Sequence, residues 1–416
     1  MIRAEGMDRG PLSEAAADRS APEAAALRGT NQSGMRDHNE RLVLSLVRRH
    51  AALAKSDIAR MTGLSAQTVS VIMRQLEQDG LLLRGEPVRG RVGQPSIPMS
   101  LAADGAFFYG LKVGRRSADL VLTDFLGRIR AARRRVYRYP TPDTVVGFVA
   151  EAAPAIAAEL DPALRGRIMG MGVAMPFQLW NWVSIIGAPQ AEMDAWRGRD
   201  IGAELADRLG LPVYVQNDAT SACGAELIFG TGERPKDFLY FYFGTFIGGG
   251  LVINGQLFLG RTGNAAAVGT MQVPAPEGGT RRLIDLASMS ILAEAMEAAG
   301  EPSDHLWNQH ERWEVSAPVL DRWLDQAAGA LAHATLAAAA LLELQAVLID
   351  GWMPVTVRAE LTRRTEAALW RLDLAGIEAP VIREGTVGAD ARALGAAAIP
   401  LSQRYLIDQN VALREG

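Results

Sequence analysis

The chain has 416 residues, of which 49% are hydrophobic and 22% charged, and its formal net charge is −4 at pH 7. A chain of this length and composition can bury several hydrophobic cores, which excludes disorder throughout its length. No window of about eighteen consecutive strongly apolar residues occurs and the first residues mix charges, so we expect no membrane span and no signal peptide, and we place the protein in the cytoplasm.

The charge is distributed unevenly along the chain. Residues 1–34 mix charged residues with Ala, Gly and Ser without a hydrophobic period, and we expect a flexible arm there. Residues 36–95 contain ten Lys and Arg against six Asp and Glu, whereas the residues after them are acidic on balance. Because DNA binding requires positive charge only where phosphates are contacted, a basic segment attached to an acidic body indicates a nucleic-acid-binding module.

The segment after the arm has the pattern of a helix-turn-helix. A first helix is expected over 39–50, Ser56 is expected to cap a short second helix that Gly63 ends, and Ser65 to cap a third helix from Ala66. The last helix of such a motif presents its N-terminal side chains to base edges in the major groove. The residues expected to contact DNA from this helix are Ser65, Gln67, Thr68, Ser70 and Arg74.

Two short strands, Leu81–Leu83 and Ile97–Leu101, are expected to flank a basic, glycine-rich loop at 84–96. This arrangement predicts the wing of a winged helix, with Arg89 and Arg91 against the phosphate backbone or in the minor groove. The expected partner is a double-stranded DNA operator. The alternative is a small helical domain whose charged loop is only solvated or that binds protein.

From Phe107 onward, strands alternate with helices, which indicates an α/β fold. Two apolar hairpins are expected, and such a repeated unit predicts two similar lobes with a small-ligand site between them. The expected hairpins are Phe107–Val113 with Ala118–Phe125, and Phe238–Phe243 with Leu251–Ile253, the second continuing through the turn pair Asn254-Gly255.

The order of motifs resembles the ROK family of repressors and sugar kinases, and in particular its repressor branch. The motifs that follow the winged helix are the first hairpin, Gly170–Pro176, Asn217-Asp218-Ala219, Gly244–Gly250 and Asp350-Gly351. The resemblance runs from about Thr30 to Leu401 and depends on the order of the motifs, not on any single one. It implies an N-terminal winged helix-turn-helix followed by a two-lobed, actin/ribonuclease H-like sugar-kinase fold.

On this basis we expect a flexible arm at 1–34, a winged helix-turn-helix DNA-binding domain at 35–101 and two kinase-like lobes at 102–228 and 229–394. A C-terminal helix at 395–416 is expected to pack back onto the first lobe. We further expect a homodimer or homotetramer, since operator half-sites commonly mirror the symmetry of the protein.

The first hairpin turn argues against kinase chemistry. The resemblance implies Asp-x-Gly-Gly-Thr-Lys at this turn in sugar kinases, where glycine amides surround phosphate. This chain reads Lys112-Val113-Gly114-Arg115-Arg116-Ser117 instead, and a lysine cannot ligate magnesium. The second turn, Gly244–Gly250, is retained, either for a nucleotide or because the hairpin needs positive φ. We therefore expect no cofactor.

The resemblance assigns Asn217 and Asp218 to sugar binding, with the carboxylate in the place of a general base. They follow a predicted strand at 212–215, so they lie where α/β proteins commonly bind ligands. Alternatively, the pair only caps a helix from Ala219. Pro176, Trp180 and Trp182 lie in the loop that frames the sugar in relatives; the tryptophans could stack on a sugar ring or pack into a core.

Other contacts implied by the resemblance are missing. The Gly-Glu-x-Gly-His segment reads Ala266–Thr270 here, and alanine accepts no hydroxyl hydrogen bond. The region of the family's zinc motif, Pro274–Arg282, contains no cysteine, and Cys223 is the only one in the chain, so we expect no metal. Candidates for new polar contacts are Arg281, Arg282 and Asp285, whereas His305 and His310 are expected at the surface.

The sequence therefore predicts a DNA-binding transcriptional regulator, a repressor of carbohydrate-metabolism genes, whose non-catalytic body senses a sugar or related metabolite. Asp218 would be a vestigial base, and no residue is expected to be catalytic. The alternative is an active ATP-dependent sugar kinase with an appended DNA-binding module, supported by Asp218 and the second glycine turn. A third hypothesis is a constitutive DNA-binding protein whose body serves only for assembly.

Overall fold

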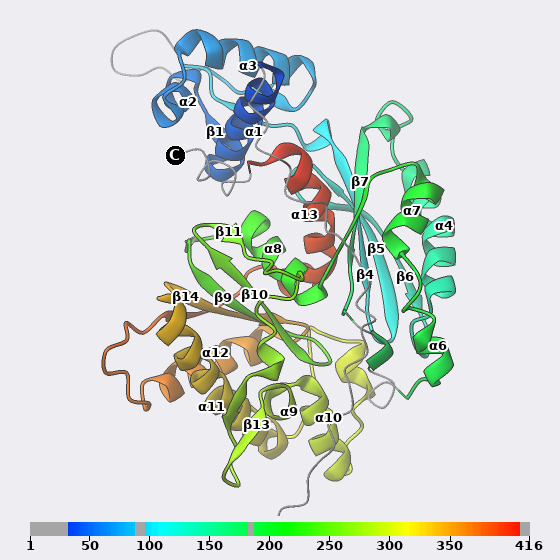
Figure 1. The fold of residues 1–416 in the computed structure, drawn as a ribbon, viewed down its shortest axis with the longest axis vertical. Coiled ribbons are helices and arrows are strands. Elements are labelled where there is room, and N and C mark those ends of the chain that lie inside the picture. Colours follow the sequence, from blue (N-terminus) through cyan, green and yellow to red (C-terminus); the bar gives the residue numbers. More distant parts are fainter. Residues whose placement is uncertain (1–31, 88–95, 178, 182–186, 234, 408–416) are drawn as a thin grey trace, which may run out of the picture.

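A computed structural model describes residues 32–87, 96–177, 179–181, 187–233 and 235–407. Figure 1 shows a small N-terminal unit at one end of a body that is built on two sheets. No helix in these described ranges is long and apolar enough to cross a lipid bilayer.

The N-terminal unit is a winged helix-turn-helix. Its elements are α1 Gln32–His50, β1 Ala52–Leu53, α2 Lys55–Thr62, α3 Ala66–Gln78, β2 Leu82–Arg84 and β3 Met99–Leu101. β3 pairs antiparallel with both β1 and β2. The predicted turn and cap are confirmed. Gly63 ends α2 in the left-handed region with φ 71°, and Oγ of Ser65 accepts a hydrogen bond from the backbone N–H of Thr68.

One predicted helix cap in this unit is wrong. The sequence places a cap at Ser56, but α2 begins at Lys55 and Ser56 lies inside its first turn. The N-cap residue is Ala54, which makes no side-chain hydrogen bond. Ser56 and Ser65 present the same local signal in the sequence, and only Ser65 immediately precedes a helix.

The first lobe, hereafter lobe 1, is built on a five-stranded sheet with the order β6-β5-β4-β7-β8. Its strands are β4 Phe107–Val113, β5 Ser117–Asp124, β6 Ile129–Val136, β7 Ile168–Ala174 and β8 Val213–Gln216. β4 and β5 form the predicted antiparallel hairpin, and β4, β7 and β8 run parallel. The helices α4 Pro142–Ala158, α6 Gln190–Asp194 and α7 Ile201–Leu209 lie on one side of the sheet (Figure 1).

The second lobe, hereafter lobe 2, repeats this pattern with the order β11-β10-β9-β14-β15. Its strands are β9 Phe238–Phe243, β10 Ile247–Ile253, β11 Gln256–Leu257, β14 Ala346–Gly351 and β15 Val381–Glu384. In both sheets an antiparallel hairpin precedes parallel strands, which confirms the predicted duplication. The other elements are the strands β12 Gln272–Pro274 and β13 Thr280–Arg282 and the helices α9 Ile284–Ala287, α10 Met289–Ala298, α11 Ala317–Leu342 and α12 Val355–Leu369.

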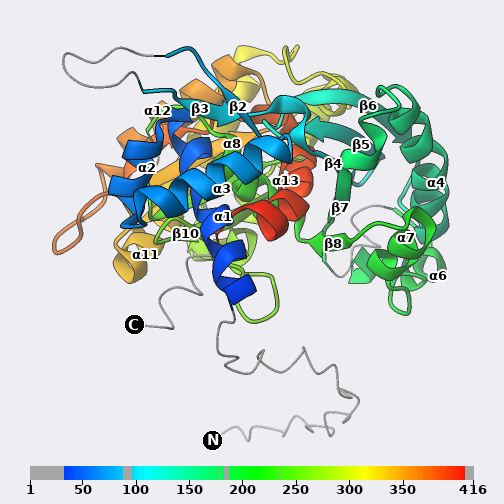
Figure 2. The ribbon, with the colours of Figure 1, turned by 90° about the horizontal axis from the view of Figure 1, so that it is seen from above.

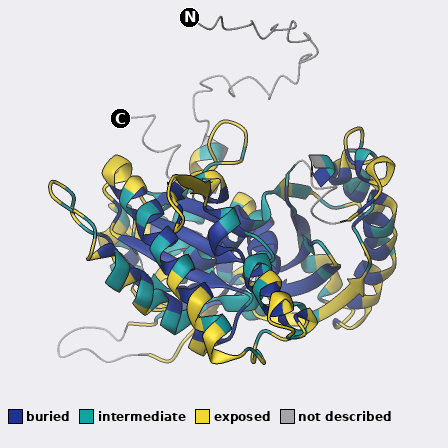
Figure 3. Ribbon diagram, turned by 90° about the horizontal axis from the view of Figure 1, so that it is seen from below, coloured by how far each residue is buried: buried dark blue, intermediate teal, exposed yellow. Residues whose placement is uncertain are grey.

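Two helices lie between the sheets and pack on each other: α8 Asp218–Phe229 against β9 and β10, and α13 Ala391–Tyr405 against β4, β5 and β7. The proposed C-terminal helix thus begins at Ala391, and residues 408–416 lie outside the described residues. Figure 3 shows the central strands of both sheets, among them β4, β9 and β14, as the buried interior of the body, whereas the edge strand β6 is mostly exposed.

The glycines of the second hairpin have a different role from the one the sequence indicates. Gly248 and Gly250 lie within β10, not in its turn, and neither has a positive φ. A Cβ on Gly250 would lie 2.2 Å from Cβ of Cys223, and one on Gly248 would lie 2.6 Å from Cβ of Ala219. These glycines allow α8 to pack closely on β10, so the expectation that they have positive φ is wrong. Positive φ occurs instead in the next turn, between β10 and β11, at Asn254 and Gly255.

Candidate functional site

The first candidate site is the exposed face of α3. Gln67 and Arg74 are exposed, whereas Val69, Ile72, Met73 and Leu76 are buried against the rest of the unit. The hydroxyls of Ser65 and Thr68 lie 2.8 Å apart at the cap, and Ser70 Oγ accepts a hydrogen bond from Lys55 Nζ at 3.2 Å. Of the five predicted contact residues on this helix, Gln67 and Arg74 therefore present the freest side chains to a partner.

Sequence reasoning missed Val71, which lies on the same helical face as Gln67 and Arg74. Its side chain is 54% exposed, although valine is apolar. An apolar contact at this place suits the methyl group of thymine in a major groove. The signal was available in the sequence, because Val71 follows Gln67 by four residues on a predicted helix.

The wing is described only in part. Arg84 at the end of β2 forms two hydrogen bonds with Glu77, at 2.6 and 3.0 Å, and these bonds hold the pKa of the Glu77 carboxyl below its ordinary value. Arg84 is thus occupied by an intramolecular partner. Arg89 and Arg91, the predicted wing contacts, lie outside the described residues.

The second candidate site is formed where β8 ends and α8 begins. Asn217 is the N-cap of α8, and its Oδ1 accepts hydrogen bonds from the backbone N–H groups of Ala219 and Thr220 at 3.0 and 3.2 Å. The alternative interpretation, that the pair caps a helix, therefore describes the role of the Asn217 side chain. Asp218 points elsewhere: its Oδ2 lies 3.3 Å from Nη1 of Arg392 in α13.

Arg392 is the main residue of this site that sequence reasoning missed. It lies 174 positions from Asp218 in the chain, yet both side chains are largely buried and form an ion pair. Its guanidinium carbon lies 5.0 Å from the ring centroid of Tyr242, so the cation also faces an aromatic ring. The available signal was that Arg392 is the only charged residue between Ala391 and Leu401, in a helix of small and apolar residues.

The first hairpin turn contributes another cation. Lys112 Nζ lies 2.7 Å from Oδ2 of Asp119 and donates a hydrogen bond to Ser117 Oγ at 3.1 Å. Burial, and next the positive charge of Arg392, lower the pKa of Lys112 to about 8. Lys112 thus lies near the end of β4, next to the turn, as a buried cation paired with a carboxylate.

The predicted loop residues do not join this group in the described chain. Pro176 is buried, and Trp180 packs against the core of lobe 1, with the guanidinium carbon of Arg197 5.4 Å from its ring centroid. These contacts favour the packing interpretation of Trp180. Trp182 lies outside the described residues. Arg282 forms an exposed ion pair with Asp285, and Arg281 forms one with Glu277.

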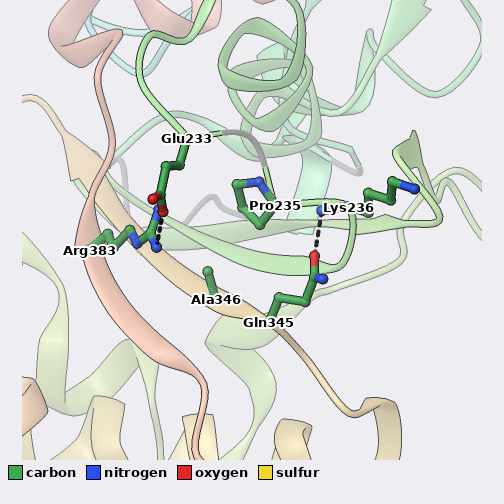
Figure 4. Close-up of a pocket in the computed structure, with 6 residues that line it drawn as sticks. All are labelled: Glu233, Pro235, Lys236, Gln345, Ala346 and Arg383. Atoms are coloured by element: carbon green, nitrogen blue, oxygen red, sulfur yellow. Dashed lines mark hydrogen bonds and ion pairs between the residues drawn. The ribbon is translucent and has the colours of Figure 1, made fainter.

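A separate surface pocket of about 530 Å³ lies at the opposite edge of the lobe 2 sheet, where β14 and β15 begin. Figure 4 shows that Glu233 and Arg383 engage each other and that Gln345 engages the backbone, whereas no interaction is drawn for the ammonium group of Lys236. Arg383 Nη2 lies 2.5 Å from Glu233 Oε2, and Oε1 of Gln345 accepts a hydrogen bond from the backbone N–H of Lys236 at 2.6 Å. No predicted site residue lines this pocket.

Comparison with family models matches residues 108–402 to the ROK family and residues 36–82 to a winged helix-turn-helix DNA-binding domain. Among curated proteins, the chain is similar to an uncharacterized protein of Sinorhizobium fredii, with 24% identity over 374 residues, 88% of this chain and 91% of the relative. It is 21% identical to the xylose repressor of Bacillus subtilis over 58% of this chain and 62% of the repressor. It is 29% identical to a transcriptional regulator of Mycobacterium tuberculosis over 52% of this chain and 49% of the regulator.

Solved structures have the same fold. A ROK family transcriptional regulator, a homologue of the Escherichia coli Mlc protein, aligns with a TM-score of 0.66 and 19% identity over 89% of this chain and 97% of that chain. A ROK family glucokinase from Streptomyces griseus, in complex with glucose and AMPPNP, aligns with a TM-score of 0.54 and 21% identity over 71% of this chain and 99% of that chain. The alignment with the regulator thus extends over more of this chain than the alignment with the kinase.

Proposed function

Because this chain belongs to the ROK family, we propose that it is a DNA-binding transcriptional regulator whose body binds a sugar or related metabolite without phosphorylating it. We further propose that it represses genes of carbohydrate metabolism as a homodimer or homotetramer in the cytoplasm. The observation that carries the proposal is that one helix, α13, contacts both the DNA-binding unit and the ion pair at Asp218.

At its C-terminal end, α13 belongs to the core of the winged helix. Tyr405 packs against Phe125 of lobe 1 with ring centroids 5.0 Å apart, in the same buried cluster as Val47 of α1 and Met73 of α3. The backbone N–H of Ile407 donates a hydrogen bond to Ser45 Oγ at 3.0 Å. Figure 2 shows this end of α13 beside α1. The DNA-binding unit is therefore packed against the body and is not connected to it by a flexible linker alone.

At its N-terminal end, α13 reaches the ligand site through Arg392. A ligand that contacts Asp218 or Arg392 therefore acts on the helix that supports α1. In a dimer, a shift of α13 would change the distance between two α3 helices, which must match half-sites about 10 base pairs apart or a multiple of that. A coupling of about 1 to 3 kcal/mol, or about 5- to 150-fold in operator affinity, is ordinary for such linkage.

The charges at the site support binding without turnover. A general base must hydrogen-bond the hydroxyl group whose proton it takes, whereas the Asp218 carboxylate contacts Arg392. Lys112 and Arg392 also repel the magnesium ion that a phosphoryl transfer requires. These features favour the sensor over the alternative of an active kinase with a DNA-binding module.

The experiment that tests the proposal selects genomic fragments with the purified full-length protein and then measures their retention in a gel. We expect a small set of fragments to be retained and a sugar or sugar derivative to change the affinity. Arg74→Ala should weaken binding to all fragments, since a lost phosphate contact is not sequence-specific. If no fragment is retained above the level of random DNA, the proposed function is wrong.

A further inference from the structure

One arginine of the DNA-binding unit points into the body of the protein. Arg48 lies in the last turn of α1, within the basic segment that indicates DNA binding. Its Nη2 donates a hydrogen bond to the carbonyl oxygen of Phe125, the residue that follows β5 in lobe 1. Its guanidinium carbon lies 5.2 Å from the ring centroid of Phe125 and 5.9 Å from that of Phe229. Arg48 therefore faces two aromatic side chains of the body.

Phe229 is the last residue of α8, and it packs against the DNA-binding unit. Phe229 and its neighbour Ile228 contact the buried cluster that contains Val43 and Val47 of α1. The same helix begins at Asp218, in the second candidate site. One helix thus extends from the lobe junction to α1, by a route separate from α13.

The surroundings of Phe229 are fixed. Gly127 has a φ of 89° in the turn between β5 and β6, and a Cβ there would collide with the Phe229 ring. Buried Asp124 holds this turn, because its Oδ1 accepts hydrogen bonds from the backbone N–H groups of Leu126 and Arg128 at 2.9 and 3.0 Å. A ring confined in this way moves only together with its neighbours.

The helix α8 is packed closely along its length. Cys223 is fully buried, and its Cβ leaves no space for a side chain at Gly250 of β10. On another side of α8, a Cβ on Gly395 of α13 would overlap the carbonyl oxygen of Ser221. A helix held so closely shifts as a unit, so a displacement at its first turn reaches Phe229 at its last.

We propose that Arg48 is a positioning residue that couples α8 to the DNA-binding unit, and that it does not contact the phosphate backbone. DNA that fixes the orientation of α3 also fixes α1, since both helices share one buried cluster, and Arg48 and Phe229 pass this constraint to α8. Because coupling is reciprocal, a ligand that shifts α8 at Asp218 changes the DNA affinity by the same factor. The inference deepens the proposed function, on which it rests for the role of DNA.

Cys223 provides a reporter for the test, because it is the only cysteine of the chain. Burial raises the pKa of its thiol well above the ordinary value, so the thiol reacts with dithiodipyridine only when α8 opens. The reaction rate is measured for the full-length protein, first free and then saturated with a retained genomic fragment. We expect the fragment to change the rate by roughly fivefold or more.

Arg48→Met keeps the length of the side chain but removes its guanidinium group. The rate of the DNA-free variant should rise by roughly fivefold or more, and DNA should no longer change it. Arg49→Gln is the matched control, because Arg49 is the next arginine of α1 but is exposed, and this variant should respond to DNA as the unaltered protein does. If Arg48→Met does not fold, Phe229→Leu removes the ring that faces the guanidinium and should abolish the response to DNA as well.

The salt dependence of DNA binding separates positioning from phosphate contact. Each lost phosphate contact reduces the slope of log affinity against log salt concentration by about one. Arg74→Ala should show this reduction. Arg48→Met should keep the slope of the unaltered protein, even where its affinity is lower.

The proposal is overturned if DNA leaves the Cys223 rate of the unaltered protein unchanged, if Arg48→Met responds to DNA as Arg49→Gln does, or if Arg48→Met reduces the salt slope. Failure of the proposed function is a different outcome, because no fragment is then retained above the level of random DNA. The DNA-free rates still decide in that case. An unaltered rate in Arg48→Met shows that Arg48 does not hold α8, whereas an increased rate keeps the link between α1 and α8 without the regulator.

Discussion

The two candidate sites of this protein place their polar groups in opposite environments. On α3, Gln67 and Arg74 extend into solvent from a helix whose opposite face is buried. At the junction of the lobes, Lys112 and Arg392 are largely buried and engaged with carboxylates. Changes on α3 should therefore alter DNA binding with little effect on stability, whereas changes at Lys112 or Arg392 should alter stability as well.

The largest expected effect is on stability and comes from Arg392→Ala. Removing one partner of a largely buried ion pair leaves Asp218 without its counter-charge, which typically lowers the free energy of unfolding by about 3 kcal/mol. Urea denaturation measures this loss. Asp218→Asn together with Arg392→Ala should recover part of it, and an unchanged midpoint for the single variant would show that the pair is not buried in solution.

The next effect is a pH dependence that belongs to Lys112. Its pKa is lowered to about 8 from the ordinary 10.5, by burial and then by Arg392. Between these two values the unfolded chain binds more protons at this residue than the folded chain, so the free energy of unfolding rises with pH across that window, by at most about 3 kcal/mol. The contribution should be absent in Lys112→Met. Parallel stability curves of the two proteins from pH 8 to 10.5 would contradict the buried state of this lysine.

Alanine substitutions at two glycines of the second hairpin test whether these glycines are needed for close packing. Gly250→Ala should lower the free energy of unfolding by about 1 to 3 kcal/mol, because the added Cβ meets Cys223 at 2.2 Å. Gly244→Ala is the control, because its nearest neighbour lies at 3.4 Å and can adjust. Thermal unfolding should separate the two variants. Equal midpoints would mean that α8 does not pack on β10 as closely as described.

The smallest effect on stability, within about 0.5 kcal/mol, is expected for Gln67→Ala on the exposed face of α3. The same change should relax preference at one base pair of the operator by about 1 to 3 kcal/mol. Competition binding with single-base variants of a retained fragment measures this loss. A uniform decrease over all variants would show that Gln67 does not read a base.

The sequence predicted local features of the fold better than long-range contacts. Ser65 and Gly63 are recognised from short-range signals because caps and left-handed turns depend on neighbouring residues. Repeated hairpins and the order of motifs indicated the two lobes. The role of Gly250 could not be predicted, since it depends on Cys223 in another element. Arg392 was missed for the same reason, because only the packing of α13 brings it to Asp218.

The most direct test of the account measures operator affinity and product formation in one reaction. A retained DNA fragment is titrated with the full-length protein in the presence of ATP, magnesium and a panel of sugars and sugar phosphates, while ADP release is followed. The account predicts that one ligand changes the operator affinity by about 5- to 150-fold and that ADP stays at background. ADP release that disappears in Asp218→Ala, with no ligand-dependent change in DNA retention, would contradict it.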